Sequence, residues 1–376
     1  MLIVQRHAKL ADGRDLIYFD DADTELGGER RIDERLLEDR PANATLRQDV
    51  LTGDWISVAA VRQNRVLLPP VESDPLAPQA PGNPSEIPDR YDVAVFENRY
   101  PSFGPDLGAV NTSGIGFERT AASFGRCEVV CFSPDSTGSL AGQTISRVRT
   151  VVEAWAERTA ALSAMEGVEQ VFPFENRGEA IGVTLHHPHG QIYGYPFVTP
   201  RTRAMLHAAD RLGRDLFERI LDRESAGPRL VIDGAHWVAF VPFAARWPIE
   251  VHLMPRRHVP DLAALASAER DELAVLLRRL LRGIDAMYET PTPYVAAWHQ
   301  APVKVGRQTL RLHLQLTSPR RAADRLKYLA GSEAAMGAWI GDIVPEEQAD
   351  RVRDALARSE ERRVGKECRS RWSPYH

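Results

Sequence analysis

Residues 184–193 read Thr-Leu-His-His-Pro-His-Gly-Gln-Ile-Tyr, which places three histidines within four consecutive positions. Residues 191–198 are rich in β-branched and aromatic side chains, and this composition predicts a β-strand. Side chains alternate between the two faces of a strand, so one face is expected to carry His187, His189, Gln191 and Tyr193. We therefore expect an imidazole and a carboxamide to lie side by side in one pocket.

The residue types of this string suit chemistry at phosphorus. A neutral imidazole is a good nucleophile, and the ordinary pKa of histidine leaves much of it neutral at physiological pH. Its attack on a phosphoryl group would give a phosphoramidate, which can pass that group to a second acceptor. Gln191 would donate to a non-bridging phosphoryl oxygen, and Gly190 would let the backbone approach a bulky anion. Each histidine alone fits a metal ligand or a hydrogen-bonded surface residue, but the whole string favours a nucleophile.

Residues 187–193, His-Pro-His-Gly-Gln-Ile-Tyr, resemble the active-site signature of the galactose-1-phosphate uridylyltransferases, a branch of the histidine-triad superfamily. The resemblance implies that the second histidine of His-Pro-His, His189, is uridylylated by UDP-glucose with Gln191 beside it. It also implies an α+β fold of two histidine-triad-like domains, made by internal duplication, with antiparallel sheets flanked by helices. The string is the one highly specific motif, and the wider resemblance covers roughly residues 46–356.

The overall composition excludes several classes of protein. The 376 residues are 43% hydrophobic and 26% charged, and the net charge of −5 argues against a duplex nucleic-acid binder. No apolar run approaches the ~18 residues of a membrane span, and the first ten residues lack a signal-peptide pattern. The three cysteines, Cys127, Cys131 and Cys368, make no disulfide framework. We therefore expect a cytoplasmic protein.

The order of predicted elements indicates two similar units after an N-terminal arm. The arm is assigned to residues 1–44; residues 1–39 are weakly patterned, so we expect them to pack poorly and regular structure to begin near Thr45. The N-terminal catalytic domain is assigned to residues 45–198 and the C-terminal domain to residues 199–358. Residues 359–376 are predicted to be a non-native or disordered tail, because the last helix should end at Arg358 and the residues beyond 361 are basic and unpatterned.

Local patterns predict the elements of each half. Apolar residues at steps of three and four indicate a helix over residues 145–165. In the second half, residues 201–223 are predicted to be helical, Asp233-Gly234 to turn a hairpin, and Ser267 to cap a helix. Strands are expected at residues 249–255, 294–299 and 309–317. This order repeats the first half, so we interpret residues 312–315, Leu-His-Leu-Gln, as a degenerate copy of the histidine string, with catalysis kept in the first copy.

Further binding residues follow from the resemblance. Arg62 and Arg65 can fork onto a diphosphate; their spacing alone favours a solvated basic loop, whereas the resemblance implies contact with the nucleotide phosphates. Asn98 matches the loop that holds uracil and ribose. The remaining residues that the resemblance assigns to the nucleotide sugar and its phosphates are Asn176, Gly182, Thr184, Lys327 and Glu333, with Glu333 on the sugar hydroxyls.

The resemblance also introduces zinc as a cofactor, because relatives usually carry a zinc knuckle in the proline-dense segment 67–88. By alignment, its four ligand positions hold Asp74, Ala77, Ser136 and His187. Structural zinc takes four ligands, typically sulfur and nitrogen, so Asp74 and His187 make a weak pair and we predict no tightly bound metal. The family's second metal site is also degraded, with these residues at its positions: His299, His313, Gln315 and Met205.

Together these features predict a uridylyltransferase that moves UMP between UDP-glucose and galactose 1-phosphate in galactose catabolism. His189 would expel glucose 1-phosphate, and galactose 1-phosphate would then collect the uridylyl group, in a two-step ping-pong scheme. Relatives build each site from two subunits, so we expect a homodimer. Two alternatives stay open. One is another nucleotidylyltransferase or dinucleotide phosphorylase of the superfamily, and the other is a non-catalytic nucleotide-sugar binding protein.

Overall fold

The protein is built on one antiparallel sheet of eleven strands. The computed structural model describes residues 3–38, 40, 44–60, 67–105 and 116–371, with side chains described as far as residue 362. In sheet order the strands are β1 (Val4–Lys9), β2 (Asp15–Asp20), β5 (Val93–Glu97), β7 (Arg126–Cys131), β9 (His189–Tyr195), β8 (Gln170–Arg177), β13 (Tyr294–His299), β14 (His313–Ser318), β12 (Ile249–Pro255), β11 (Trp237–Phe240) and β10 (Leu230–Asp233).

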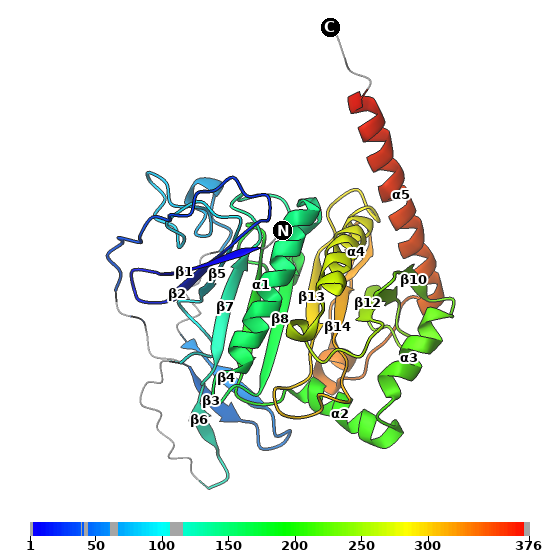
Figure 1. Cartoon of the computed structure of the whole chain (residues 1–376). Helices are drawn as coiled ribbons and strands as arrows, with labels where there is room; N and C mark the ends of the chain where they lie inside the picture. Colours follow the sequence, from blue (N-terminus) through cyan, green and yellow to red (C-terminus); the bar gives the residue numbers. More distant parts are fainter. Residues whose placement is uncertain (1–2, 39, 41–43, 61–66, 106–115, 372–376) are drawn as a thin grey trace.

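Two long helices cover one face of this sheet. α1 (Ile145–Ser163) and α4 (Ser267–Asp285) lie side by side in front of the central strands (Figure 1). Thr144 begins α1 as its cap, because its side chain accepts a hydrogen bond from the backbone N–H of Arg147 at 3.1 Å. The apolar stripes of both helices join the inward side chains of the strands in one core cluster. The predicted helix over residues 145–165 is therefore confirmed, and its stripe is core.

The topology shows the predicted duplication. Each half contains two strands, a long helix and two more strands, in the order β5-β7-α1-β8-β9 and then β11-β12-α4-β13-β14. The halves meet where β8 pairs with β13, so the second half continues the sheet of the first with its strand order reversed. This places β9 and β14 at equivalent positions, one strand away from the junction. The α+β fold with antiparallel strands and flanking helices is the one predicted.

Residues 4–20 are not a poorly packed arm, and the expectation that regular structure begins near Thr45 is wrong. β1 pairs with β2, and β2 pairs with β5 in a register that sets Leu16 opposite Phe96. Five of the six residues of β2 are buried. β2 reads Asp-Leu-Ile-Tyr-Phe-Asp, and such a short apolar run is typical of a strand covered on both faces. Charged residues on either side of the run conceal it in the sequence.

Three helical predictions also change. The segment 201–223 forms two helices, α2 (Pro200–Leu212) and α3 (Leu216–Ser225). Ala266, not Ser267, is the cap of α4, and its backbone N–H donates to Glu269 Oε2 at 2.7 Å. The last helix, α5 (Pro345–Arg371), does not end at Arg358, and its end projects from the body of the molecule (Figure 1). Glu and Arg, which are good helix formers, continue past Arg358, so the first part of the expected tail is helical.

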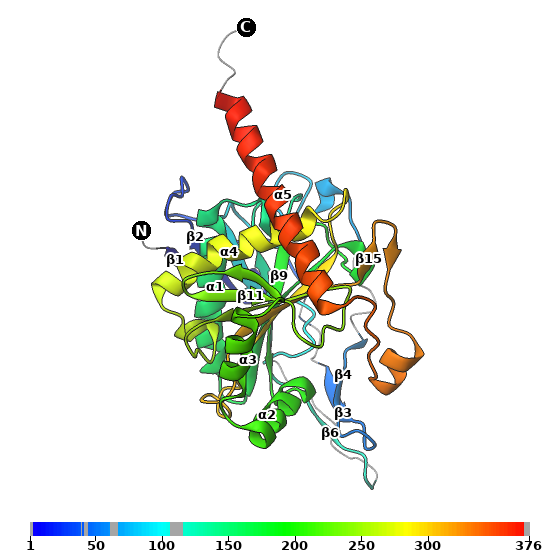
Figure 2. The ribbon, with the colours of Figure 1, turned by 90° about the vertical axis from the view of Figure 1, so that its right-hand side faces the viewer.

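Smaller elements lie on the side of the sheet away from α1. Figure 2 shows β15 and the three-stranded sheet on the side opposite α1. The three-stranded sheet consists of β3 (Thr45–Gln48), β4 (Trp55–Val58) and β6 (Thr120–Ala122), and β15 (Arg320–Ala322) pairs with β16 (Arg325–Leu326). The short helical turns are η2 (Val71–Ser73), η3 (Leu140–Gly142), η4 (Glu179–Ile181), η5 (Leu262–Ala264) and η6 (Gly331–Ala335). In the described part of the chain, none of the helices has the length and apolar character needed to cross a membrane.

Because β2 is part of the folded sheet, we predict that two Leu-to-Ala substitutions within residues 3–38 differ in their effect on stability. Leu16→Ala, at a fully buried position, should lower the free energy of unfolding by about 2–5 kcal/mol through lost burial and a cavity. Leu36→Ala, at a fully exposed position, should change it by less than about 0.5 kcal/mol. Urea unfolding followed by circular dichroism measures both. Equally small effects would show that β2 does not belong to the folded core.

Candidate functional site

His189 and Gln191 lie at the start of β9, near the middle of the main sheet. Cys131 of β7 stands opposite His189, and Phe174 of β8 stands opposite Gln191. Exposure alternates along β9: His189, Gln191 and Tyr193 are partly exposed, whereas the residues between them are buried. Ile192 belongs to the core cluster under α1, so the partly exposed set faces away from the helices. The prediction that an imidazole and a carboxamide share one face is therefore confirmed for His189 and Gln191.

Gly190 serves packing on the opposite face, which corrects its expected role in the approach of an anion. A Cβ atom at this position would lie 2.8 Å from Phe132 Cζ and 2.9 Å from the carbonyl oxygen of Phe174. Phe132 in turn contacts Trp155 of α1 edge to face, with ring centroids 6.0 Å apart. Glycine is required here because the aromatic core approaches the strand closely on the helix side.

His187 does not share the face of His189, and this part of the strand prediction is wrong. β9 begins only at His189, after Pro188, which has no N–H for a strand ladder. The His187 ring is buried; its Nδ1 lies 2.6 Å from Asp74 Oδ2, and its Nε2 lies 2.8 Å from the carbonyl oxygen of Ser133 and 3.0 Å from Tyr91 Oη. The side chain of His187 is therefore held by groups from three other parts of the chain.

The backbone of His187 sets the proton position on His189. His189 Nδ1 lies 2.7 Å from the carbonyl oxygen of His187, which can only accept, so Nδ1 carries the proton and donates. The lone pair of the neutral ring then lies on Nε2. Burial lowers the pKa of His189 below its ordinary value of 6.5; the charge of His187 lowers it as well, and the bond to the carbonyl opposes the shift. The ring is therefore neutral at physiological pH, with Nε2 as its nucleophilic atom.

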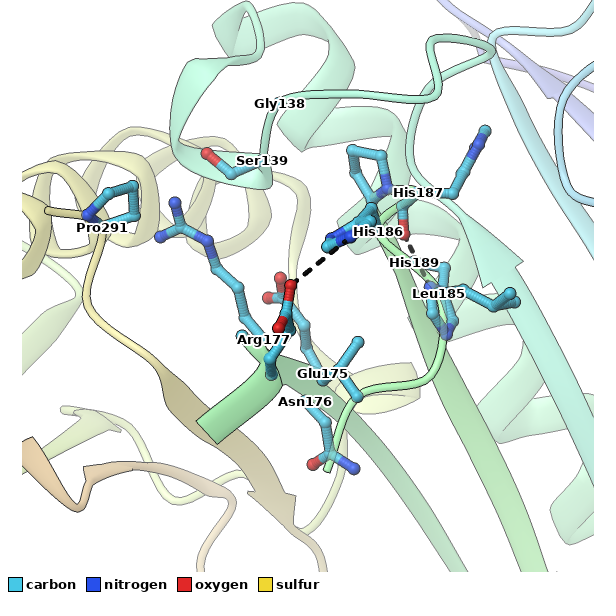
Figure 3. Close-up of a pocket in the computed structure, with 14 residues that line it drawn as sticks. Gly138, Ser139, Glu175, Asn176, Arg177, Leu185, His186, His187, His189 and Pro291 are labelled. Carbon is cyan, nitrogen blue, oxygen red and sulfur yellow. Dashed lines mark hydrogen bonds and ion pairs between the residues drawn. The ribbon is translucent and has the colours of Figure 1, made fainter. Parts of the chain in front are cut away.

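A cavity of about 200 Å³ opens where β8 ends and β9 begins. It is lined by residues from the end of β8, the loop that leads to β9 and the segment before η3 (Figure 3). Arg177 extends toward Ser139 and Pro291, whereas Asn176 points away from them (Figure 3). Burial raises the pKa of Glu175 to about 7, although the hydroxyl of Tyr294 donates to its Oε1 at 3.0 Å.

Among the other expected binding residues that the structure describes in the first half, Asn176 lines the cavity, whereas Asn98, Gly182 and Thr184 do not. Asn176 and His189 both line the cavity, and Asn98 follows β5, with its side-chain oxygen accepting from the N–H of Tyr100 at 2.9 Å. Gly182 has a φ of 80°, a conformation that favours glycine, and the Thr184 carbonyl accepts from the N–H of Leu68 at 2.8 Å. The expected phosphate ligands Arg62 and Arg65 lie outside the described residues.

Lys327 and Glu333 are not brought to the cavity of their own chain. Neither residue lines it, and the Lys327 ammonium is buried 3.4 Å from Glu333 Oε1 and 3.0 Å from the carbonyl oxygen of Arg246. They belong to a segment that follows β16 and exposes several large apolar side chains: Tyr328, Leu329, Met336, Ile340 and Val344.

The residues at the family's zinc positions do not make a zinc donor set. Asp74, Ser136 and His187 do come together, but as a hydrogen-bonded group. Burial raises the pKa of Asp74, yet hydrogen bonds from His187 and Ser136 and the charge of His187 outweigh it, so this pKa is lowered overall. His187 has both ring nitrogens engaged by protein groups, and Ala77 has no donor atom. A hydrogen-bond network thus occupies the place where a tetrahedral zinc would need four ligands.

The second half carries a buried counterpart of His189. His313 is the first residue of β14, and its Nδ1 donates to the carbonyl oxygen of Arg311 at 2.8 Å, two residues back as in His189. Its Nε2, however, accepts from Gln315 Nε2 at 3.1 Å, while Gln315 Oε1 accepts from Arg201 at 2.6 Å. The nucleophilic lone pair is therefore occupied, which supports the interpretation of a silent copy.

Sequence reasoning missed one of the histidines that lie around His313. His252 of β12 lies beside His313, with ring centroids 5.8 Å apart, and His299 stacks on His313 at 5.1 Å. Burial lowers the pKa of His313 to about 3 and that of His299 well below its ordinary value. The nearby guanidinium of Arg201 would repel a metal ion, so this set does not fit a metal either. The pairing of β12 with β14, which brings His252 in, has no local sequence signal.

Two family models match the chain. The N-terminal domain of galactose-1-phosphate uridyl transferases matches residues 37–199, and their C-terminal domain matches residues 204–363. A galactose-1-phosphate uridylyltransferase of Streptomyces lividans is 42% identical over 367 residues, which are 92% of this chain and 96% of that protein. One of Thermotoga maritima is 35% identical over 315 residues, which are 82% of this chain and 98% of that protein.

Solved structures agree with these relatives. A uridylyltransferase structure matches with a TM-score of 0.76 at 32% identity, over 84% of this chain and 99% of its own. An ADP-glucose phosphorylase of Arabidopsis thaliana matches with a TM-score of 0.62 at 23% identity, over 82% of this chain and 97% of its own. The second likeness concerns the fold alone.

The geometry around His189 predicts a specific tautomer and an acid-shifted titration. In protein with ¹⁵N-labelled histidine, long-range ¹H–¹⁵N spectra should show the neutral ring of His189 protonated on Nδ1, with a titration midpoint below 6.5 because burial disfavours the charged form. His189→Gln identifies the signal by removing it. A proton on Nε2 of the neutral ring, or a midpoint at or above 6.5, would contradict this assignment.

Proposed function

This chain belongs to the galactose-1-phosphate uridylyltransferase family, and we propose that it transfers the uridylyl group through a covalent bond to His189. As a member of this family it is a nucleotidyltransferase of galactose metabolism. The observation that carries the proposal is the bond from His189 Nδ1 to the carbonyl oxygen of His187, which leaves the Nε2 lone pair for attack.

In the first step, His189 Nε2 attacks the α-phosphorus of UDP-glucose. A nitrogen–phosphorus bond forms, the bond to the bridging oxygen breaks, and glucose 1-phosphate leaves. The ring gains positive charge in the adduct, and the carbonyl of His187 stabilises the proton that stays on Nδ1. In the second step, a phosphate oxygen of galactose 1-phosphate attacks the same phosphorus, the nitrogen–phosphorus bond breaks, and UDP-galactose forms.

Gln191 is placed to assist both steps. Its Oε1 accepts from the hydroxyl of Tyr193 at 3.2 Å, so its amide nitrogen is turned the other way and keeps its N–H groups for a phosphoryl oxygen. A neutral donor suits charge that shifts between non-bridging and leaving oxygens. Asn176, Gly182 and Thr184 are proposed to contact the same phosphates, together with Arg62 and Arg65, and Asn98 to hold uracil and ribose.

The two rival functions have less support. The fold is shared with an ADP-glucose phosphorylase, but the identity to that structure is 23%, against 42% to the uridylyltransferase of Streptomyces lividans. A non-catalytic binding protein would not need a neutral imidazole whose Nε2 has no hydrogen-bond partner among the described residues, beside an oriented amide. We also propose a cytoplasmic location, which the buried free thiol of Cys131 supports.

Covalent catalysis predicts an adduct on His189. Intact-mass spectrometry after incubation with UDP-glucose should show one added uridylyl group per chain, because the intermediate accumulates when no galactose 1-phosphate is present. His189→Gly should abolish the adduct, and added galactose 1-phosphate should discharge it. An adduct mapped to His187, or none on active enzyme, would refute this role for His189.

The position of Lys327 and Glu333 supports a homodimer with composite sites. Figure 2 shows β15, which precedes their segment, on the side of the sheet away from α1. His189 lies on the strand face turned away from the long helices, yet Lys327 does not line the cavity of its own chain. We propose that this segment, with its exposed apolar side chains, completes the site of the partner by binding the sugar and phosphates of UDP-glucose.

Composite sites predict complementation between inactive subunits. A mixture of His189→Gly and Lys327→Ala chains, allowed to exchange, should recover part of the wild-type activity, because one of the two sites in a heterodimer receives only intact residues. Each variant alone serves as the control. If subunits exchange, as shown by mass photometry of differently tagged chains, and activity stays absent, each chain closes its own site.

We propose further that no zinc is tightly bound, since the donor set around Asp74 is a hydrogen-bond network. Protein purified without a His tag should contain far less than one zinc per chain by elemental analysis, and chelation should leave its activity unchanged. Near-stoichiometric zinc that is lost together with activity on chelation would show that the donor set has been misjudged.

A further inference from the structure

The N-terminal segment, defined here as residues 3–38, pairs with β5 and also contacts the proline loop, residues 67–88. The match to the family's N-terminal domain begins at residue 37, so almost all of this segment lies outside it. The proline loop has little backbone pairing of its own apart from short turns and two isolated bridges, Pro78 to Ile87 and Ala80 to Asn83. Other parts of the chain must therefore hold it in place.

Apolar side chains of the N-terminal segment and the proline loop form one buried cluster. Leu10, Leu16 and Tyr18 of the segment pack there with Leu76 and Ile87 of the loop. The cluster is separate from the main core under α1, and the residue that precedes the histidine string, Leu185, packs against it. The segment and the loop together supply half of the buried residues of this cluster, and Tyr91, β5 and β7 supply the other half.

Buried polar contacts join the same two parts of the chain. The guanidinium of Arg14, 1% exposed, donates to Glu86 Oε2 at 2.5 Å and to the carbonyl oxygen of Glu97 at 2.8 Å. Asp33 accepts from Gln79 Nε2 at 3.2 Å and from the N–H of Ala11 at 2.9 Å. A buried ion pair fixes geometry because an unpaired charge left there would be costly.

Hydrogen bonds connect the loop to His187. Glu86 donates its N–H to the carbonyl oxygen of Pro75 at 2.8 Å, next to Asp74, and the hydroxyl of Tyr91 donates to the carbonyl oxygen of Leu76 at 2.7 Å. Asp74 and Tyr91 then contact the two ring nitrogens of His187 at 2.6 Å and 3.0 Å. The carbonyl of His187 receives the proton-bearing nitrogen of His189.

We propose that the N-terminal segment positions the nucleophile, by holding the proline loop through Arg14 and so fixing Asp74, Tyr91 and the His187 carbonyl that orients the His189 ring. Protein contacts thereby fix the conformation of this loop, as a structural metal ion fixes a loop that carries its ligands. Arg14, Asp33 and Tyr91 are positioning residues, because none of them touches the reacting atoms. The inference rests on the proposed role of His189.

The test compares Arg14→Gln and Tyr91→Phe with a matched control in the same segment, Arg6→Gln. Arg6 pairs with Asp20 at 2.7 Å and is not part of the network that holds the loop, so its loss removes one ion pair of the segment without releasing the loop. The rate of His189 uridylylation by saturating UDP-glucose is measured in single turnover by mass spectrometry. Urea unfolding of each variant reports its stability.

Loss of positioning should slow uridylylation about tenfold in Arg14→Gln and Tyr91→Phe, with the KM for UDP-glucose changed less than twofold. Arg6→Gln should react at the wild-type rate, and Arg14→Lys should recover part of the loss. The Nδ1–H signal of His189 should broaden or shift in Tyr91→Phe and not in Arg6→Gln. If Arg14→Gln fails to fold, Asp33→Asn and Tyr91→Phe carry the test.

The outcomes separate the two proposals. A wild-type protein that forms no adduct would refute the covalent role of His189 and this inference with it. A wild-type protein that forms the adduct, with the Arg14 and Tyr91 variants reacting at its rate, would overturn only the inference. Equal slowing in Arg6→Gln would also overturn it, because the effect would then follow general loosening of the segment.

Discussion

The antiparallel pairing of β8 with β13 is the constraint on which the rest of the structure depends. It continues the hydrogen-bond ladder of the first half into the second, so the sheet has no open edge at its centre. α1 and α4 then cover one continuous surface, and their apolar stripes share a core. The pairing also fixes β9 and β14 as equivalent strands, which puts His189 and His313 in corresponding places on either side of the junction.

The two histidines show how burial decides whether the same local geometry is reactive. Both donate Nδ1–H to the carbonyl two residues back, and both have a glutamine two residues on. At His189 the glutamine is turned by Tyr193 and the ring is partly exposed, so Nε2 is available. At His313 the glutamine closes onto Nε2, held by Arg201, and the ring is buried among other imidazoles. The second copy thus keeps the backbone geometry of the first, but its Nε2 is occupied and its ring is buried.

The histidine string itself divides into three environments. His186 is exposed beside Glu179, His187 is buried in a polar network, and His189 begins the strand. Pro188 makes this possible because it delays strand pairing by one residue, which lets His187 turn toward Asp74 while its carbonyl stays next to His189. The orientation of the His189 ring is thus linked through one backbone carbonyl to a network that comes from distant parts of the chain.

The sequence by itself determined the long helices, most strands, the duplication and the pairing of His189 with Gln191 on one face. These depend on periodicity and turn residues within about twenty positions, or on a motif read directly. Only the tertiary structure decided that β1 and β2 join the sheet. It also decided that Gly190 allows close packing of the core, and that His187 is hydrogen-bonded with Asp74 and Tyr91. Asp74 and His187 are 113 positions apart, and no local pattern records such a contact. The packing of distant segments selects which of several chemically suitable partners a buried side chain meets.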